Sequence, residues 1–347
     1  MPDLEYTIFP VRKRVIKVTI SNNQSTATAN PHVQEIKINH GYLLALLSVG
    51  IDPYVIPLNT IFYDPQANAQ AYSWYDSFDG TYHRWFVKTP SIGANSTYTF
   101  YMIIDIMQQL VDGKYAGINA IYGQNYLGLS YGQYDNGKNV FLLYDNFAGT
   151  TLSSIWSKSG NGTINVNNGV TITVTSSQSP TSLVTSISSV PSTGVITRLW
   201  AIVNSIGGSS NAGYVLTYGN NIFTSSENSY ITLWWTDGNT DDQLAKKISG
   251  TYYSLAKVSD STILNKLFYG YFMWYYTTTS YLYMFESLTN KSLSVSDNTY
   301  TLSALQQLGF QTQQPGSGTS SYTTYAIAFF DAPPNGVMPV VSFSVLD

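Results

Sequence analysis

The hydrophobic pattern of this chain repeats every two residues over most of its length. Within residues 14–20, Ile16, Val18 and Ile20 fall on one side, and residues 34–39 alternate isoleucine with polar residues in the same way. Successive side chains of a strand point to opposite faces, so this pattern predicts half-buried β-strands. Stretches dominated by β-branched and aromatic residues predict further strands at 271–276, 280–286, 325–330 and 340–346.

Residues 163–175 form the clearest local signal, a β-hairpin. Two alternating runs flank the three-residue loop Asn167-Asn168-Gly169, which places Val166 opposite Val170. A loop of this length needs a residue in the left-handed region, and Gly169 supplies it.

Helical signals are few. Short helices are expected within 41–50 and 303–308, and no longer segment sustains an amphipathic period. Many short strands without alternating helices favour antiparallel sandwiches over βαβ units. The glycine-spaced stretch 112–137 is expected to connect two domains. The sequence therefore predicts an all-β chain with two antiparallel, jelly-roll-like β-sandwich domains in tandem, 1–140 and 141–347.

The composition argues against several classes of function. Charged residues are 10% of the 347 residues, against roughly 25% in an ordinary soluble domain. With 16 Lys and Arg against 20 Asp and Glu, the net charge is −4, which argues against a nucleic-acid-binding face. Cysteine is absent, so disulfide and thiol chemistry are excluded. No signal peptide is recognised, and no apolar run is long enough to predict a membrane span.

Residues suited to catalysis are scarce. The residues from Gly128 to Gly132 match the G-x-S-x-G pattern around a nucleophilic serine, but all three histidines precede Ser130. The chain has four glutamates, and a glycoside hydrolase needs two carboxylates across a cleft. We therefore expect no enzyme activity, and a glycosidase built on Glu227 and Glu286 remains the less favoured alternative.

One segment resembles a calcium loop. Asp237, Asn239 and Asp241 supply oxygen ligands at positions 1, 3 and 5. Position 6 is Asp242 where glycine is needed, and position 12 is Ile248 where a bidentate glutamate is needed. The expectation is a chain without a cofactor, with Ca²⁺ at this loop as the one alternative.

Four N-x-[ST] sequons offer sites for N-glycosylation. Their asparagines are Asn23, Asn95, Asn161 and Asn290.

Adjacent aromatic residues are the strongest binding feature. Since neighbours on a strand point to opposite faces, one ring of each pair should face outward or into a groove. An exposed ring is a flat apolar platform for a sugar; alternatively, such rings fill the core or a subunit interface. The candidate glycan-binding residues are Trp74, Tyr75, Trp234, Trp235 and Trp274.

Several longer motifs resemble a known archaeal arrangement of two domains. Residues 131–156 are similar to its junction, and residues 332–343 to its closing strand. The motifs at 16–23, 34–38 and 84–102 are similar to its upstream domain. The upstream part is an uncharacterised β-sandwich domain of unknown function. The downstream part is a concanavalin A-like (laminin-G-like) jelly roll, which implies a lectin-like second domain.

The resemblance implies a surface protein of thermophilic archaea or of their viruses. Most cellular members carry a signal peptide and a membrane anchor, and neither is recognised here, which favours a virion. The leading hypothesis is a non-enzymatic structural or host-attachment protein at the virion surface, in a capsid shell, spike or turret. Its partners would be other virion proteins, further copies of itself and host-surface glycans. The alternative is a carbohydrate-binding protein of the cell envelope.

Overall fold

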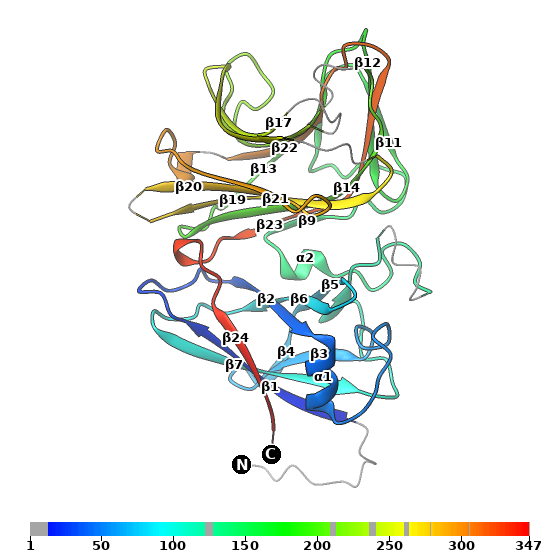
Figure 1. Ribbon diagram of the computed structural model, residues 1–347, viewed down its shortest axis with the longest axis vertical. Coiled ribbons are helices and arrows are strands. Elements are labelled where there is room, and N and C mark those ends of the chain that lie inside the picture. Colours follow the sequence, from blue (N-terminus) through cyan, green and yellow to red (C-terminus); the bar gives the residue numbers. More distant parts are fainter. Residues whose placement is uncertain are drawn as a thin grey trace. The chain divides into compact units, whose positions relative to one another are not determined.

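The computed structural model describes residues 13–121, 128–208, 213–235, 241–259, 264–277, 279–304 and 306–346. The chain is an all-β protein whose sheets are antiparallel apart from one short parallel pairing (Figure 1). It divides into two compact units. Unit 1 takes Met1–Ala120, Gln124–Val140 and Met338–Asp347, and unit 2 takes Ile121–Gly123 and Phe141–Val337.

Unit 1 is a sandwich of two sheets. Its five-stranded sheet runs, in order, β24 (Val340–Val345), β1 (Lys13–Asn22), β7 (Ser96–Asp105), β3 (Thr60–Asp64) and β4 (Ala69–Ala71). Its four-stranded sheet runs β2 (His32–Asn39), β6 (Tyr82–Thr89), β5 (Ser73–Phe78) and β8 (Ala116–Ile118). The alternation in β1 sets the core, because Ile16, Val18 and Ile20 are each fully buried.

Unit 2 is a larger sandwich. Its seven-stranded sheet runs β10 (Ser157–Ser159), β13 (Thr181–Ser186), β22 (Gln307–Thr312), β15 (Gly213–Asn220), β16 (Asn228–Trp235), β17 (Asp241–Ile248) and β18 (Thr251–Ser259). Its eight-stranded sheet runs β11 (Thr163–Val166), β12 (Val170–Thr175), β23 (Thr319–Asp331), β14 (Gly194–Ser205), β19 (Leu267–Tyr276), β20 (Ser280–Glu286) and β21 (Lys291–Ser296), with β9 (Leu143–Asp145) on β23. One aromatic-rich core fills the space between the two sheets.

The predicted hairpin is confirmed. β11 pairs with β12, with Val166 opposite Val170 and Ile164 opposite Ile172. In the loop, Asn168 occupies the left-handed region at φ 50°, and Gly169 follows at φ 121°. The turn thus uses an asparagine as well as the glycine, because Asn tolerates this conformation better than most residues.

The first predicted helix is also present as α1 (His40–Leu47). The side chain of Asn39 caps it by accepting a hydrogen bond from the amide of Tyr42, and Ser48 ends it in the left-handed region. Within the described ranges, no helix is long and apolar enough to cross a membrane.

The second predicted helix, at 303–308, is wrong. Only a 3₁₀ turn, Leu302–Ala304, forms there, and strand β22 begins at Gln307. Leu308 and Phe310 are fully buried, and β13 and β15 pair with β22 on either side. Ladder hydrogen bonds and burial of alternate residues outweigh the short helical pattern.

The C-terminal strand differs from its expected place. Residues 332–343 resemble the end of the second domain, yet β24 pairs with β1 of unit 1, with Val18 opposite Phe343. The hydroxyl of Tyr42 also donates to the Phe343 carbonyl. Figure 1 shows β24, in red, beside β1, in dark blue. Unit 2 is therefore inserted ahead of the last strand of unit 1. The predicted division after residue 140 coincides with the division between the units, but Met338–Asp347 belong to unit 1 and not to the second domain.

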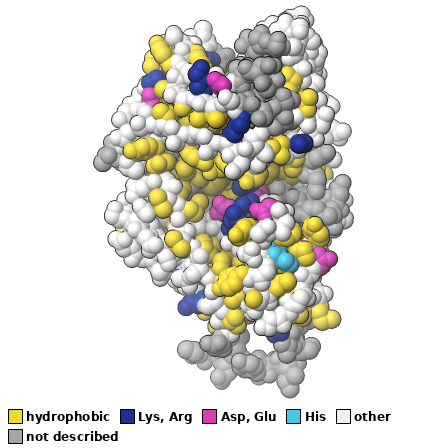
Figure 2. Space-filling view, in the orientation of Figure 1, with side chains coloured by type: hydrophobic (Ala, Val, Ile, Leu, Met, Phe, Trp, Pro, Cys, Tyr) yellow, Lys and Arg dark blue, Asp and Glu magenta, His cyan; other side chains and the backbone are white. Residues whose placement is uncertain are grey.

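The low charge of the sequence is visible on the surface. The face in Figure 2 carries few Lys, Arg, Asp or Glu side chains, and most of it is apolar or uncharged polar.

Candidate functional site

Four of the predicted glycan platforms lie inside the protein. Trp74, Tyr75, Trp234 and Trp274 are each exposed by 1% or less. These rings do not face outward as platforms; they fill the interior, which was the alternative, because Trp234 and Trp274 point into the core between the sheets of unit 2 and Tyr75 into the core of unit 1. Trp74, for example, packs against Phe86 and donates its indole N–H to Asp135. Trp235 belongs to β16, but its side chain lies outside the described residues.

The predicted calcium loop falls mostly outside the described part of the chain. Asp237 and Asn239 lie there, and only Asp241 is described, at the start of β17. Its carboxylate lies 3.7 Å from the ammonium of Lys257. Among the residues that the structure describes, no three His, Asp or Glu side chains gather as a metal site would require. Calcium binding at this loop stays a prediction.

The two carboxylates of the glycosidase alternative both serve local structure. Glu227 is fully buried and accepts hydrogen bonds from the Phe223 amide and the Ser229 hydroxyl. Glu286, also buried, accepts from the amides that follow it and from the Thr289 hydroxyl. Glu227 precedes β16 of one sheet and Glu286 ends β20 of the other. Neither has the open, substrate-facing position of a catalytic acid or base.

Ser130 lies in an irregular turn of unit 1. Its amide donates to the side chain of Gln133, and a further turn follows it. A nucleophile elbow needs a strand before the serine and a helix after it. The G-x-S-x-G match is therefore a loop.

The four sequon asparagines Asn23, Asn95, Asn161 and Asn290 are all exposed. Exposure is what a modifying enzyme would require of these asparagines. N-glycosylation at the four sites stays a prediction.

The outer face of the seven-stranded sheet carries a site that the sequence did not single out. Strand pairing aligns Val215 with Leu233 and with Gln311, and Thr217 with Ile231. Because side chains alternate, these residues share the face opposite the core. Val215, Ile231 and Leu233 are 4% exposed or less and form, with Ala245, a small apolar cluster separate from the main core.

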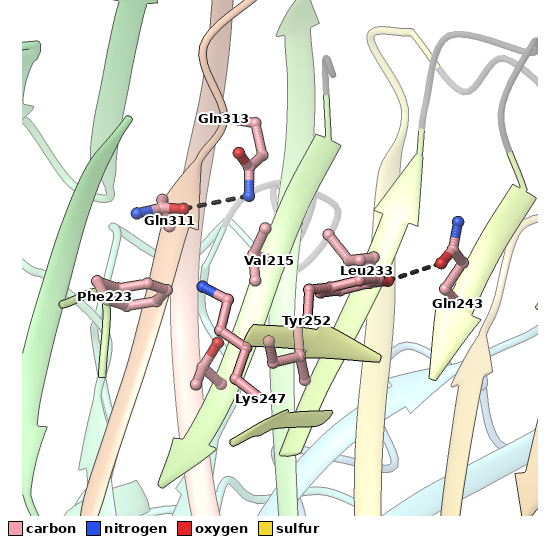
Figure 3. A pocket seen from close by; sticks show the side chains of 10 residues that line it. Val215, Phe223, Leu233, Gln243, Lys247, Tyr252, Gln311 and Gln313 are labelled. Carbon is pink, nitrogen blue, oxygen red and sulfur yellow. Dashed lines mark hydrogen bonds between the residues drawn. The ribbon is translucent and has the colours of Figure 1, made fainter. Parts of the chain in front are cut away.

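Aromatic and polar side chains surround this cluster and leave a hollow of about 170 Å³. We call it the groove; it is lined by Val215, Thr217, Phe223, Ile231, Leu233, Gln243, Lys247, Tyr252, Gln311 and Gln313. Figure 3 shows Phe223 on one side of Lys247 and Tyr252 on the other. The groove thus combines two aromatic rings, three amide side chains and one ammonium over an apolar floor.

The glutamine and tyrosine side chains hold one another in place. Gln313 donates an amide hydrogen to Gln311 at 3.2 Å, and the Tyr252 hydroxyl donates to Gln243 at 2.6 Å (Figure 3). Burial raises the pKa of Tyr252 to about 12, so its hydroxyl keeps its proton near neutral pH. Each glutamine has two donors and an acceptor, and these pairings leave hydrogen-bonding capacity free for a ligand.

Phe223 is positioned by local backbone and packing. It adopts φ 62°, which is unusual for a non-glycine residue, and Glu227 accepts its amide hydrogen at 3.0 Å. A Cβ on Gly309 would lie 2.8 Å from the Phe223 ring. The absence of a side chain at Gly309 therefore makes room for the ring at the edge of the groove.

The charge of Lys247 is neutralised from below. Its ammonium lies 2.8 Å from the carboxylate of Glu227, which is fully buried, while the Lys247 side chain is 27% exposed. The ion pair leaves the groove close to neutral and fixes the ammonium as an oriented hydrogen-bond donor.

Replacing Glu227 with glutamine should lower the free energy of unfolding by about 1–3 kcal/mol. The neutral amide removes the charge opposite Lys247 and replaces one of the two acceptor oxygens that the Phe223 amide, the Ser229 hydroxyl and Lys247 share. Urea unfolding measures this loss. Lys257→Gln is the control, because it breaks an exposed ion pair with Asp241 and should cost less than about 1 kcal/mol. Equal losses in the two variants would contradict the structural role of Glu227.

The floor of the groove contains an unsatisfied polar group. The hydroxyl of Thr217 is buried and has no hydrogen-bond partner among the residues described. A buried polar group without a partner costs free energy. Among the described residues, the hydroxyl of Thr217 is therefore left without a hydrogen bond in the floor of the groove.

Comparison with known proteins gives one relative in sequence. No family model matches the chain. A stretch of 147 residues is 31% identical to "Uncharacterized protein 562" of Sulfolobus islandicus rod-shaped virus 1. The aligned stretch covers 41% of this chain and 23% of the viral protein. The chain thus spans less than a quarter of the length of this viral relative.

Several solved structures are similar to about half of the chain. The VIP36 exoplasmic/lumenal domain, in a Ca²⁺/Man3GlcNAc-bound form, is 10% identical, with a TM-score of 0.39 over 51% of this chain and 83% of that one. The carbohydrate-binding module CBM66 of Bacillus subtilis is 11% identical, with a TM-score of 0.37 over 52% and 98%. A Lotus tetragonolobus seed lectin is 12% identical, with a TM-score of 0.38 over 53% and 95%. Likeness at this level is too distant to assign a ligand to this chain.

Proposed function

We propose that this chain is a non-enzymatic carbohydrate-binding protein of a virus of thermophilic archaea, and that its groove binds glycans of the host surface. The observation that carries the proposal is the lining of the groove: Phe223 and Tyr252 beside an apolar floor, with Gln243, Gln311 and Gln313 around it. A saccharide has the complementary surface, because its ring presents apolar C–H faces edged by hydroxyl groups.

The hydrogen-bonding groups of the groove suit neutral sugars. Glutamine amides donate and accept at once, as a sugar hydroxyl does. Lys247 adds a donor whose charge is balanced by Glu227. None of the described lining residues is acidic. These features favour a neutral glycan over a nucleotide, which needs several cationic groups, and over a metal ion, which needs carboxylates.

The same lining supports binding without turnover. A glycosidase of the usual kind needs two carboxyl groups flanking the bond that is cleaved. Glu227, which pairs with the groove residue Lys247, is fully buried. A ligand in the groove would meet amides, aromatic rings and an ion-paired ammonium, and none of the described lining residues carries a carboxyl group.

The viral part of the proposal rests on the relative from a rod-shaped virus of Sulfolobus. An attachment protein of such a virus would lie at the virion surface, with other virion proteins and further copies of itself as partners. Mass spectrometry of purified particles tests this part, and we expect the chain among their proteins. Its absence from intact particles would contradict a virion role and leave glycan binding in the groove untouched.

Removing the amides of the groove should abolish binding without harming the fold. We expect the wild type to bind members of a glycan array, and Gln311→Ala with Gln313→Ala to weaken that binding at least tenfold. Gln66→Ala is the matched control, since Gln66 is exposed in a turn of unit 1. Thermal unfolding should be similar in all three. Unchanged binding by the double variant would overturn the assignment of the groove.

A further inference from the structure

A second hollow, which we call the end pocket, lies at the loops of unit 2 and has a volume of about 570 Å³. Three segments that are distant in the sequence line it: Val190, Pro191 and Ser192; Tyr276 and Ser280; and Asn298, Tyr300, Thr301, Leu302 and Ser303. It shares none of these residues with the groove. Its volume falls within the range of small-ligand sites.

The back wall of the end pocket is fixed in place. The hydroxyl of Tyr300 donates to the carbonyl of Lys247, and its ring packs edge-on against Tyr230, with centroids 5.4 Å apart. The Tyr230 hydroxyl donates to Asp297 at 2.7 Å, and the Lys246 ammonium lies 2.6 Å from the same carboxylate. A wall held in this way needs little reordering when a ligand binds.

Two of these contacts show how the end pocket and the groove are arranged around β17. Lys246 and Lys247 are neighbours on this strand, so their side chains leave it on opposite faces. Lys247 lines the groove, and Lys246 holds Asp297 beside the end pocket. The two hollows therefore lie on opposite sides of one strand.

The lining of the end pocket contains no ionisable acid or base apart from tyrosine among the described residues. Asn298 accepts the amide hydrogen of Ser280 at 2.8 Å, which orients its own amide donors. The ring of Tyr276 is 52% exposed at the rim, and Val190, Pro191 and Leu302 supply an apolar wall. Hydroxyls, one amide and an exposed ring beside an apolar wall match a neutral, hydroxyl-rich ligand with an apolar face.

We propose that the end pocket is a second saccharide site, so that unit 2 binds two sugars at once. The class of ligand rests on the proposed function, while the site itself is independent of the groove. Two sites on one unit would convert weak single contacts into strong attachment to a surface that presents many glycans.

Isothermal titration with neutral trisaccharides (mannotriose, maltotriose and chitotriose) tests this inference on the full chain. We expect two trisaccharides per chain for the sugar that binds. Tyr276→Ala and Gln311→Ala should each reduce the number to one. On a surface coated with that sugar, either variant should lose at least tenfold in apparent affinity. Tyr253→Ala is the matched control, because Tyr253 is 46% exposed and lines neither hollow.

The possible failures are distinguishable. One sugar per chain that is lost in Gln311→Ala and kept in Tyr276→Ala would overturn the second site and support the groove. One sugar that is lost only in Tyr276→Ala would support the end pocket and overturn the groove. If none of the three trisaccharides gives a heat signal above that of buffer with the wild-type chain, both proposals are overturned. Because Tyr276 is an exposed ring, unchanged thermal unfolding of its variant will show that the fold is intact.

Discussion

Replacing Trp234 with alanine is expected to lower the free energy of unfolding by about 3–5 kcal/mol. Trp234 is 1% exposed, and its ring lies 6.3 Å from Tyr214 and 6.4 Å from Phe268, measured between centroids. A Cβ on Gly270 would meet this indole at 2.7 Å, so the ring fills its space closely. Its removal leaves a large cavity that the surrounding sheets cannot close.

Urea unfolding with fluorescence detection measures this loss, and the exposed Tyr276→Ala variant should lose less than about 1 kcal/mol. Any loss of glycan binding in Trp234→Ala should follow the unfolded fraction. A variant that lost binding but kept wild-type stability would contradict the burial of Trp234 and restore its role as a platform.

Acid should destabilise unit 1 through one buried histidine. His83 is fully buried, stacks on Phe78 and lies within hydrogen-bond distance of Tyr75 and His40, at 3.2 and 3.1 Å. Burial, and secondly the nearby His40, lower the pKa of His83 to about 3, against a weaker opposite effect of Asp79. In the unfolded chain a histidine titrates near 6.5. Between these values the unfolded state binds the proton and the folded state does not.

The free energy of unfolding should therefore fall as pH drops below about 6.5, with a total contribution of roughly 4–5 kcal/mol once pH reaches 3. Above pH 7 the histidine is neutral in both states and contributes no slope. Urea unfolding at pH 7 and pH 4 measures the difference. His83→Gln should reduce it by about 3 kcal/mol, whereas Tyr75→Phe, which keeps the imidazole buried, should retain it. An identical pH dependence in wild type and His83→Gln would contradict this account.

Carboxylates are the other source of acid sensitivity in this chain. A chain with 20 acidic residues has few ionised carboxylates to lose in acid. Asp297 is a carboxylate whose stabilising effect on the fold is lost in acid. Burial alone would raise the pKa of Asp297, but hydrogen bonds from Lys246 and Thr299 and from Tyr230 lower it below its ordinary value. Its stabilisation is present above the unfolded pKa and is lost as pH falls through the folded value.

Local patterns in the sequence predicted local structure well. The hairpin around Gly169 and the strands near 271–276 and 280–286 follow from alternation and turn residues, which act over a few neighbours. The strand at 340–346 was also predicted, but its partner was not. Pairing between β1 and β24 joins residues more than 300 positions apart, and no local pattern specifies such a partner.

Predicting the candidate site also requires knowledge of which strands, distant in the sequence, pair with one another. Alternation shows that Trp234 and its neighbours point to opposite faces, but it does not show which face a second sheet covers. The groove residues carry a weaker signal in the sequence: Gln311 and Gln313 alternate with Phe310 and Thr312, which are buried. That spacing marks an outward polar face. Only strand pairing brings it beside Val215, Lys247 and Tyr252.

Titration of isotope-labelled protein with the best-binding trisaccharide, followed by NMR of the glutamine side-chain amides, tests the groove most directly. Each glutamine amide gives its own signal, and Gln243, Gln311 and Gln313 all line the groove. We predict that their signals shift with a common affinity, while that of Gln66 in unit 1 does not move. Saturable binding that leaves all three groove signals unchanged would contradict the assignment of this face as the glycan site.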